Sequence, residues 1–317
     1  MLRPIRAPAS ALITASVLLC IPFAQSFAAA APQPESASPP GATQRGAQAR
    51  PDVERQRQQA EQQARITVDP DAAAAIQETH NALKAIAEGK KDQALAAIER
   101  ATGKINVLVA RKPATGLLPV DAQVTVIDVA PIDSGAIRQI AKSAERAVKE
   151  RDYPEARVVL YNLASEIRVR TYHLPLATYP AALDTAARLL DQGKNREAEA
   201  VLRNALNTLV VIDRVLPIPI VTAQAEINAA EAQRDKDKAS AQRALAVARA
   251  ELERARELGY AGSDPEYAQL TQAVSDLEKQ VEGNENTTSA FAKLKERVAS
   301  FFKRLTGGEK RSEVAGR

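Results

Sequence analysis

The sequence predicts a mainly α-helical protein: a bundle of helical hairpins with a small three-stranded β-sheet, followed by extended C-terminal helices. Apolar residues recur every three or four positions over most of the chain after residue 69, which indicates amphipathic helices. Three short segments instead have strand-like patterns, and two of them alternate apolar and polar residues. Each of these segments follows a pair of predicted helices, so the chain contains three helix–turn–helix–strand units.

Residues 1–30 have the pattern of a secretory signal peptide. Arg3 and Arg6 give a positive start, and residues 9–21 form an uncharged apolar run. This run has about 13 residues, whereas a membrane-spanning helix needs about 20. Small residues around Ala28 follow at the cleavage positions. We therefore expect export to the periplasm with removal of residues 1–30; an uncleaved membrane anchor is the alternative.

The composition narrows the function classes. Cys20 is the only cysteine and lies in the signal segment, so we expect no thiol chemistry and no disulfide in the exported chain. Two of the 43 basic residues lie there too, and with 39 acidic residues the remainder is nearly neutral. Aromatic residues make up 3% and tryptophan is absent. Because nucleic-acid binding needs a basic face and aromatic platforms, we expect no nucleic-acid partner.

Residues 31–65 are rich in Pro, Gln and Arg, which predicts a disordered tether. A nascent polar helix over its second half, from Asp52 to Arg65, is the alternative. Folded structure should begin at Asp69, a capping residue that precedes a proline in the first helical turn. The first predicted helix ends near Gly89.

The first unit continues with a helix that contains Gly103 and then a strand over residues 120–128. A glycine inside a helix costs about 1 kcal/mol relative to alanine, so we expect close packing against a neighbouring helix there. The second unit should start with Ser134 as the helix cap and turn near Arg151. Its strand covers residues 167–172.

The third unit turns near Gly193 and ends in a strand over residues 210–216. The unequal spacing of the three units argues against a strict solenoid repeat. Connections that contain two helices are long enough to join parallel strands, and antiparallel pairing is equally open.

The chain changes from strand to helix between residues 172 and 180. A proline ends the strand, and a second proline lies in the first turn of the next helix. We interpret four residues as the structural motif that shapes this corner: Tyr172, Pro175, Tyr179 and Pro180.

Residues 236–283 are predicted to form appended helices. Residues 222–259 are continuously helix-forming, and the polar stretch 233–238 suggests that this helix leaves the globular domain. Apolar residues between Leu245 and Ala255 follow coiled-coil spacing, and they fit either a short coiled coil or a packed surface helix.

Residues 286–306 are predicted to form a basic amphipathic helix, and residues 307–317 a disordered tail. Two hypotheses fit this helix: residues 289–305 lie on an anionic membrane surface, or its stripe docks on the preceding helices. The apolar stripe consists of Phe291, Leu294, Val298, Phe301, Phe302 and Leu305.

No pattern of catalytic or metal-binding residues is present. His80 and His173 are the only histidines, and neither has partners at the spacing of a zinc or catalytic site. Phosphate-binding and nucleophile-elbow motifs are also missing. We therefore expect a protein that is not an enzyme and needs no cofactor.

Four segments together resemble the YfdX family of exported bacterial stress-associated proteins. They are ATGK at 101–104, LPV at 118–120, SEIRVRTYHLPLATYPAAL at 165–183 and VVIDRVLPIPIVTAQ at 210–224. The resemblance covers about residues 67–235, and we assign 66–235 to a YfdX-like helical domain. It implies self-association and a link to acid or envelope stress, with chaperone-like or small-molecule-binding behaviour.

The resulting expectation is a non-enzymatic periplasmic stress protein that is chaperone-like or protective and responds to acid. It would form a homo-oligomer and bind unfolded client proteins. One alternative is a helical scaffold associated with an anionic membrane surface through residues 289–305. The other alternative is a protein that sequesters small molecules.

Overall fold

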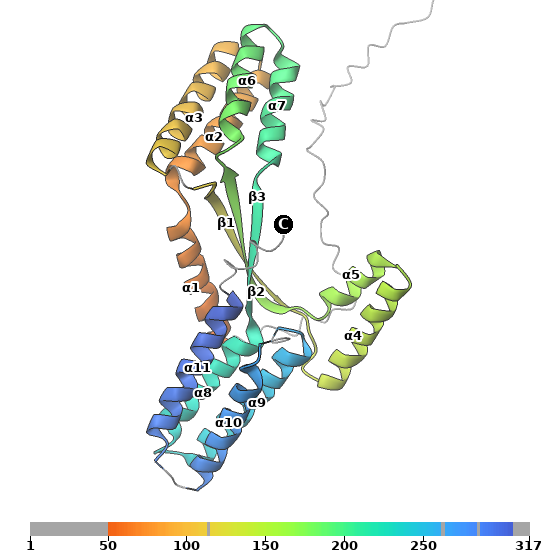
Figure 1. Ribbon diagram of the computed structural model, residues 1–317, viewed down its shortest axis with the longest axis vertical. Helices are drawn as coiled ribbons and strands as arrows, with labels where there is room; N and C mark the ends of the chain where they lie inside the picture. The colour runs from red at the N-terminus through yellow and green to blue at the C-terminus, as the bar shows by residue number, and fades with distance from the viewer. Residues whose placement is uncertain (1–49, 113–114, 261–263, 284–285, 307–317) are drawn as a thin grey trace, which may run out of the picture. The chain divides into compact units, whose positions relative to one another are not determined.

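The computed structural model describes residues 50–112, 115–260, 264–283 and 286–306. Within these residues the chain forms 11 helices and one three-stranded antiparallel sheet, which confirms the mainly α prediction (Figure 1). The expected signal segment, the first part of the expected tether and the expected C-terminal tail lie outside the described residues.

The sheet consists of β1 (Leu117–Asp128), β2 (Ser165–Pro175) and β3 (Val210–Pro217) in the order β1-β2-β3. Both pairings are antiparallel, which settles the direction that the sequence left open. The physical reason lies in the connections. Two antiparallel helices return the chain to its starting point, so each strand re-enters the sheet beside the end of the previous one.

The first helical bundle combines two hairpins from different parts of the chain (Figure 1). One hairpin is α2 (Pro70–Ala87) and α3 (Lys91–Arg111), and the other is α6 (Tyr179–Asp191) and α7 (Asn195–Asn207). Asp69 caps α2 as expected, because its carboxylate accepts hydrogen bonds from the N–H groups of Asp71 and Ala72. Gly89 and Gly193 end the first helix of each hairpin with φ of 71° and 74°.

The explanation expected for Gly103 is wrong. Gly103 is exposed on α3, and a Cβ atom built on it would meet no atom within 4 Å. No helix packs closely against this position, and the structure gives no reason for the glycine. Helix α3 packs instead through Ala94, Ala97, Ala101 and the larger residues between and beyond them.

The second bundle contains α8 (Ile218–Gln233), α9 (Lys238–Glu257), α10 (Tyr267–Glu282) and α11 (Thr288–Thr306). The expected continuous helix over 222–259 is wrong, because a turn after Gln233 separates α8 from α9. Asp237 caps α9 by accepting a hydrogen bond from the Ser240 N–H group at 3.0 Å. The polar stretch is thus a helix connection, and Leu245, Ala248, Leu252 and Ala255 face the core of the bundle.

The stripe of α11 docks on this bundle. Phe291, Leu294, Val298 and Phe301 are at most 2% exposed, and Phe302 is half-buried. The side chain of Leu305 lies outside the described part of the chain. At about 1.5–3 kcal/mol for each fully buried large apolar side chain, the four buried residues contribute roughly 6–12 kcal/mol as an upper estimate. The apolar face of α11 is therefore part of a core.

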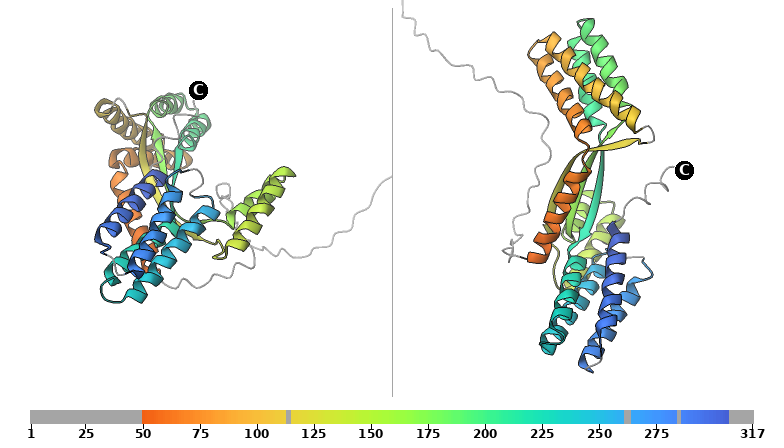
Figure 2. Two further views of the ribbon diagram at one scale, coloured as in Figure 1. Left: turned by 60° about the horizontal axis from the view of Figure 1, so that its bottom comes forward. Right: turned by 90° about the vertical axis from the view of Figure 1, so that its left-hand side faces the viewer.

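The prediction of a disordered tether is wrong for residues 51–65, which belong to helix α1 (Pro51–Thr67), and the alternative of a polar helix from Asp52 to Arg65 is the correct one. Val53, Ala60 and Ala64 of α1 are buried against one face of the sheet, where Ile167, Val169 and Leu216 lie. Figure 2 shows α1 beside the strands. The composition of this segment gave no sign of burial, because only three of its 17 residues pack inward and two of these are alanines.

The remaining hairpin joins β1 to β2 and consists of α4 (Ser134–Lys149) and α5 (Tyr153–Tyr161). The residue before the predicted cap performs that function, since the Asp133 carboxylate accepts a hydrogen bond from the Ala136 N–H group at 2.7 Å. Arg151 makes the turn with a φ of 61°, a left-handed backbone conformation that residues other than glycine rarely adopt.

The predicted corner lies where β2 meets the first bundle. Pro175 is the last residue of β2, Pro180 lies in the first turn of α6, and Tyr172 is half-buried against the bundle core. Tyr179 is 1% exposed, and its hydroxyl donates a hydrogen bond of 2.8 Å to the Thr79 hydroxyl. Burial raises the pKa of Tyr179 to about 12, so the phenol remains a donor at ordinary pH.

We predict that Tyr179→Phe lowers the free energy of unfolding by about 1 kcal/mol, because Thr79 loses its buried donor while the ring still fills its site. Tyr161→Phe serves as the control, since Tyr161 is 48% exposed and its substitution should leave stability unchanged. Urea unfolding of both variants measures the difference. Equal stability of the two variants would show that the corner does not depend on this hydrogen bond.

Candidate functional site

The α4–α5 hairpin carries a shallow apolar groove on its surface. The groove has a volume of about 410 Å³, and apolar atoms dominate its lining. Val148 and Leu160 flank it and are 48% and 51% exposed. The lining residues are Ala141, Ala144, Glu145, Val148, Lys149, Leu160 and Leu163.

Large exposed apolar side chains are concentrated around this hairpin. Of the 16 large apolar residues that are exposed in the described chain, seven lie within residues 129–161. Single exposed apolar residues are normal, but a concentration of them marks a binding surface. The seven are Val129, Ile132, Val148, Tyr153, Val158, Leu160 and Tyr161.

The hairpin does not need these side chains for its own packing. Its buried positions are Ile137 and three small residues, Ala144, Ala147 and Ala156. Alanines let the two helices approach closely, and Ile140, Val159 and Leu163 are half-buried. The exposed apolar side chains lie outside this packing.

A buried arginine fixes the base of the hairpin to the second bundle. Arg254 of α9 has a side chain that is only 5% exposed. Its Nε donates to the Pro131 carbonyl oxygen at 3.1 Å, and its Nη2 donates to the Ala130 carbonyl oxygen at 3.2 Å. The carboxylates of Asp128 at 3.5 Å and Glu251 at 3.3 Å balance its charge. Arg254 thereby holds the segment that leaves β1.

A second set of hydrogen bonds holds the segment that enters β2. The Ser165 hydroxyl donates to Asp128 at 2.7 Å, and the Ser165 N–H group donates to the Tyr260 hydroxyl oxygen at 2.9 Å. Tyr260 in turn donates to the Glu166 carboxylate at 3.0 Å. Burial raises the pKa of Tyr260, and the nearby charge of Glu166 adds to this effect, so the phenol stays protonated.

The two ends of the hairpin are also joined directly. The N–H groups of Val129 and Ala130 both donate to the Ala164 carbonyl oxygen at 3.0 Å. The buried polar groups at the base are therefore paired with one another, as burial requires. Chemically, this arrangement positions a surface; it has no side chain poised as a nucleophile or general base.

Glu226 of α8 lies beside this network in an unfavourable environment. Burial is the main reason that the pKa of its carboxyl is raised, and the charges of Asp52 and Glu251 raise it further. Asp52 of α1 and Glu251 of α9 are thus close enough to Glu226 for their charges to act on it, and Glu251 also pairs with Arg254.

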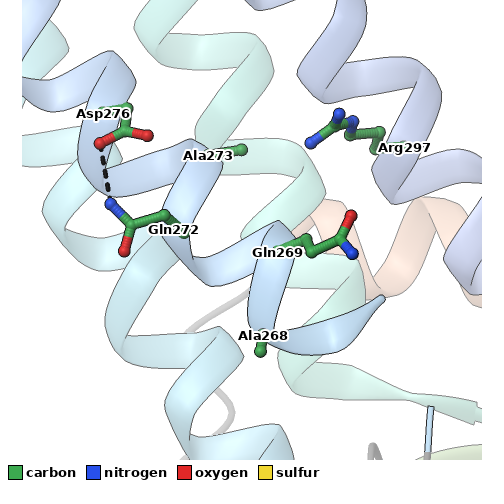
Figure 3. Close-up of a pocket in the computed structure, with 6 residues that line it drawn as sticks. All are labelled: Ala268, Gln269, Gln272, Ala273, Asp276 and Arg297. Atoms are coloured by element: carbon green, nitrogen blue, oxygen red, sulfur yellow. Dashed lines mark hydrogen bonds between the residues drawn. The ribbon is translucent and has the colours of Figure 1, made fainter. Parts of the chain in front are cut away.

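A further shallow groove, also of about 410 Å³, lies between α10 and α11 (Figure 3). Figure 3 shows Arg297 of α11 across from Gln269 and Ala273 of α10, with Gln272 donating to Asp276 at 2.8 Å. This lining is mostly small and polar, and it brings together no pair of groups suited to acid–base chemistry.

The predicted corner and the two histidines are separate from the α4–α5 groove. His80 is exposed on α2, whereas His173 is half-buried on β2. Within the described ranges, no three His, Cys, Asp or Glu side chains are grouped so as to hold a metal ion. No described helix is both long enough and apolar enough to cross a membrane.

The α4–α5 groove and the buried Arg254 at the base of the hairpin were not predicted from the sequence. The apolar run that forms α5 is visible in the sequence, but helical periodicity assigns such residues to a core. An arginine on a helix is usually solvated, so Arg254 gave no signal. Only the fold reveals that it faces two backbone carbonyl groups.

We predict that Arg254→Met lowers the free energy of unfolding by about 3 kcal/mol, because two buried carbonyl groups and two carboxylates lose their partner. Arg256→Met is the control two residues along α9, where the side chain is 60% exposed. Hydrogen exchange should accelerate at the amides of Val129 and Ala130 in the first variant alone. Unchanged exchange there would contradict the role of Arg254 at the hairpin base.

For Glu226 the raised pKa means that the fold disfavours the charged carboxylate. Stability from this group is present below the ordinary glutamate range and is lost as pH rises through the raised value. We predict that Glu226→Gln stabilises the protein at pH 7 by about 0.5 kcal/mol after solvent screening, and has no effect near pH 4. Urea unfolding at both pH values measures this gain. Glu99→Gln is the control, because Glu99 is exposed on α3. A gain of equal size at pH 4 would contradict the assignment.

Comparisons with known proteins address the domain that contains the hairpin and the sheet. Residues 75–215 match the YfdX protein family. The solved structure of YfdX from Salmonella Typhi is 18% identical to this chain. The match covers 47% of this chain and 91% of that chain with a TM-score of 0.33, which is too low to support an argument. No match was found among curated proteins. The family match falls within the expected range of 67–235, and residues 75–215 of this chain are a YfdX domain.

Proposed function

We propose that this protein is a non-enzymatic protective protein of the periplasm that binds apolar segments of partly unfolded client proteins. The observation that supports the proposal is the apolar α4–α5 groove, whose lining includes the exposed Val148 and Leu160, within a segment, residues 129–161, that carries five further exposed large apolar side chains. A client that has lost its core exposes apolar segments, and their contact with this surface removes apolar area from water.

The shape and rim of the groove suit varied clients. It is shallow and open, so it does not select one ligand shape. Glu145 and Lys149 lie among its lining residues and offer one charge of each sign at its rim. An apolar centre with a polar rim is the usual composition of a protein-binding surface. The rigid base, fixed by Arg254, keeps the surface in place without covering it.

The signal-like residues 1–30 and the YfdX domain support the periplasmic part of the proposal. An acid response is consistent with the 39 acidic residues, because protonation of carboxylates below about pH 5 leaves the chain strongly cationic. Burial and the charges of Asp52 and Glu251 raise the pKa of the Glu226 carboxyl, so this group takes up its proton above the ordinary glutamate range.

Two alternatives have less support. Attachment to an anionic membrane through residues 289–305 would require α11 to withdraw four buried apolar side chains from its bundle. Sequestration of a small molecule usually needs a more enclosed cavity than the two shallow grooves. A second copy of the chain is another candidate occupant of the α4–α5 surface, because the YfdX resemblance implies a homo-oligomer.

We predict that the purified chain suppresses the aggregation of a chemically unfolded enzyme, measured by light scattering. Replacing Val148 and Leu160 together by Gln should raise the chain concentration needed for half-suppression at least threefold, because both flank the groove. The matched control replaces Val107 and Val109 of α3, which are 51% and 40% exposed, by Gln.

The outcomes separate the alternatives. Absence of suppression by the unmodified chain, or equal loss in both double variants, contradicts the proposal. Sedimentation velocity completes the test: an assembly that dissociates in the groove variant while suppression persists would assign the surface to self-association.

A further inference from the structure

Strand β3 forms one edge of the sheet, because it pairs only with β2 (Figure 1). In an antiparallel edge strand, every second residue points its N–H and C=O groups away from the sheet. Apart from the pairing with β2, no backbone hydrogen bond within the described part of the chain involves residues 210–215. The outward groups of these residues are therefore open to a further strand, whose own backbone matches their alternating donors and acceptors.

The opposite edge of the sheet is protected. The pairing of β1 with β2 shifts register between Pro119 and Asp121, and a proline has no N–H group to offer. The Asp69 N–H group donates to the Pro119 carbonyl oxygen at 2.8 Å. Ala122 and Val124 pack against the cluster that contains the buried residues of α1. An irregular register, a proline and a covering helix are usual ways in which proteins block an edge strand.

Strand β3 lacks these protections along most of its length. Its pairing with β2 runs without a register shift from Val210 to Pro217, and Pro217 is its only proline. Val210, Val211 and Ile212 are 37%, 49% and 46% exposed. Successive side chains of a strand point to opposite faces, so a further strand would meet apolar side chains of β3 on both faces of the sheet.

The two charged residues of β3 differ in their partners. Asp213 accepts two hydrogen bonds of 2.8 Å from the Arg170 guanidinium of β2, which balances its charge inside the sheet. The side chain of Arg214 is half-buried and makes no ion pair or hydrogen bond within the described residues. Opposite charges attract when they lie directly across from each other on neighbouring strands. Arg214 therefore favours an acidic residue opposite to it on a further strand.

A second copy of β3 does not meet this requirement. In a closed dimer both copies offer the same outer edge, so the strands run antiparallel about a two-fold axis perpendicular to the sheet. Opposed side chains lie on the same face, and the numbers of two opposed residues then add to an even number. Asp213 of one copy therefore never lies opposite Arg214 of the other. The registers centred on these residues oppose Asp213 to Asp213 or Arg214 to Arg214, which is unfavourable.

We propose that the free edge of β3 binds an extended segment of another protein as a fourth strand of the sheet. The edge defines the segment: apolar side chains opposite residues 210–212, an acidic side chain opposite Arg214, and a backbone that is unpaired in its own protein. This site lies on a different element from the α4–α5 groove, and it does not depend on the function proposed for that groove.

The test measures fluorescence anisotropy of a fluorescein-labelled peptide added to the full chain. The peptide has valine at the positions opposite Val210, Val211 and Ile212 in antiparallel register, and glutamate opposite Arg214. We expect saturable binding that falls at least tenfold when the peptide amides facing β3 are N-methylated, because the backbone hydrogen bonds are then blocked. Equal binding of the methylated peptide, or no binding of either peptide, would overturn the proposal.

Substitutions in the chain test the position and the register. Val211→Lys with Ile212→Lys should weaken peptide binding at least tenfold, because lysines block an edge strand. The matched control is Val107→Lys with Val109→Lys on α3, where the side chains are similarly exposed, and it should bind as the unmodified chain does. Replacing the peptide glutamate by lysine should weaken binding about threefold, and Arg214→Glu should reverse this preference. Equal loss in both double variants, or an unchanged preference in Arg214→Glu, contradicts the proposed site.

Two further measurements separate other occupants and other sites. Val148→Gln with Leu160→Gln should leave peptide binding unchanged, and a loss there would assign the peptide to the α4–α5 groove. Sedimentation velocity addresses the second copy. A dimer of the unmodified chain that binds no peptide, and that dissociates in the Val211→Lys and Ile212→Lys variant, would assign the edge to self-association and overturn the proposal.

Discussion

One central strand connects every helical group in the described chain. Strand β2 pairs with β1 on one side and β3 on the other, so it is the only strand of the described sheet with no free edge. The α4–α5 hairpin precedes it, the corner into α6 follows it, and α1 lies on its Ile167 and Val169. At its start, Glu166 accepts a hydrogen bond from Tyr260, which follows the end of α9, and this contact ties the strand to the second bundle. A displacement of β2 would therefore move all of these groups together.

The polar groups between the end of β1 and the start of β2 define the position of the α4–α5 hairpin. A buried ion pair gains little net free energy, because removing charges from water offsets their attraction. The contacts of Arg254 with two backbone carbonyl groups are nonetheless directional, and only one placement of the hairpin satisfies them. Replacing the whole charged group by apolar residues could fill the same space at little cost in stability, but it would allow the hairpin to rotate or slide; replacing Arg254 alone is costly, because its partners remain buried and unpaired. The arrangement thus favours a defined location for a surface that has little packing of its own.

The sequence predicted what depends on local chemistry. The three strands, the cap at Asp69 and the turns at Gly89 and Gly193 follow from alternation, capping and left-handed glycines, and the structure confirms them. Where distant contacts decide, sequence patterns left the structure open or predicted it wrongly. Strand direction depends on how helix pairs return, α1 depends on a sheet face supplied by residues over 100 positions away, and the break before α9 depends on bundle packing. The α4–α5 surface was missed for the same reason, since periodicity cannot show which apolar face lacks a partner.

The insertion of α4 and α5 between paired strands has a consequence for the kinetics of folding. Pairing Asp128 with Ser165 closes a loop of 36 intervening residues, and the entropy lost on closure slows such non-local contacts. The intervening helices contact each other locally and form on shorter timescales than strand pairing. Once they have formed, the chain ends of the hairpin are already close, and the remaining search resembles that of a tight β-turn. The helical insertion therefore acts as a folding element that shortens the effective loop between β1 and β2.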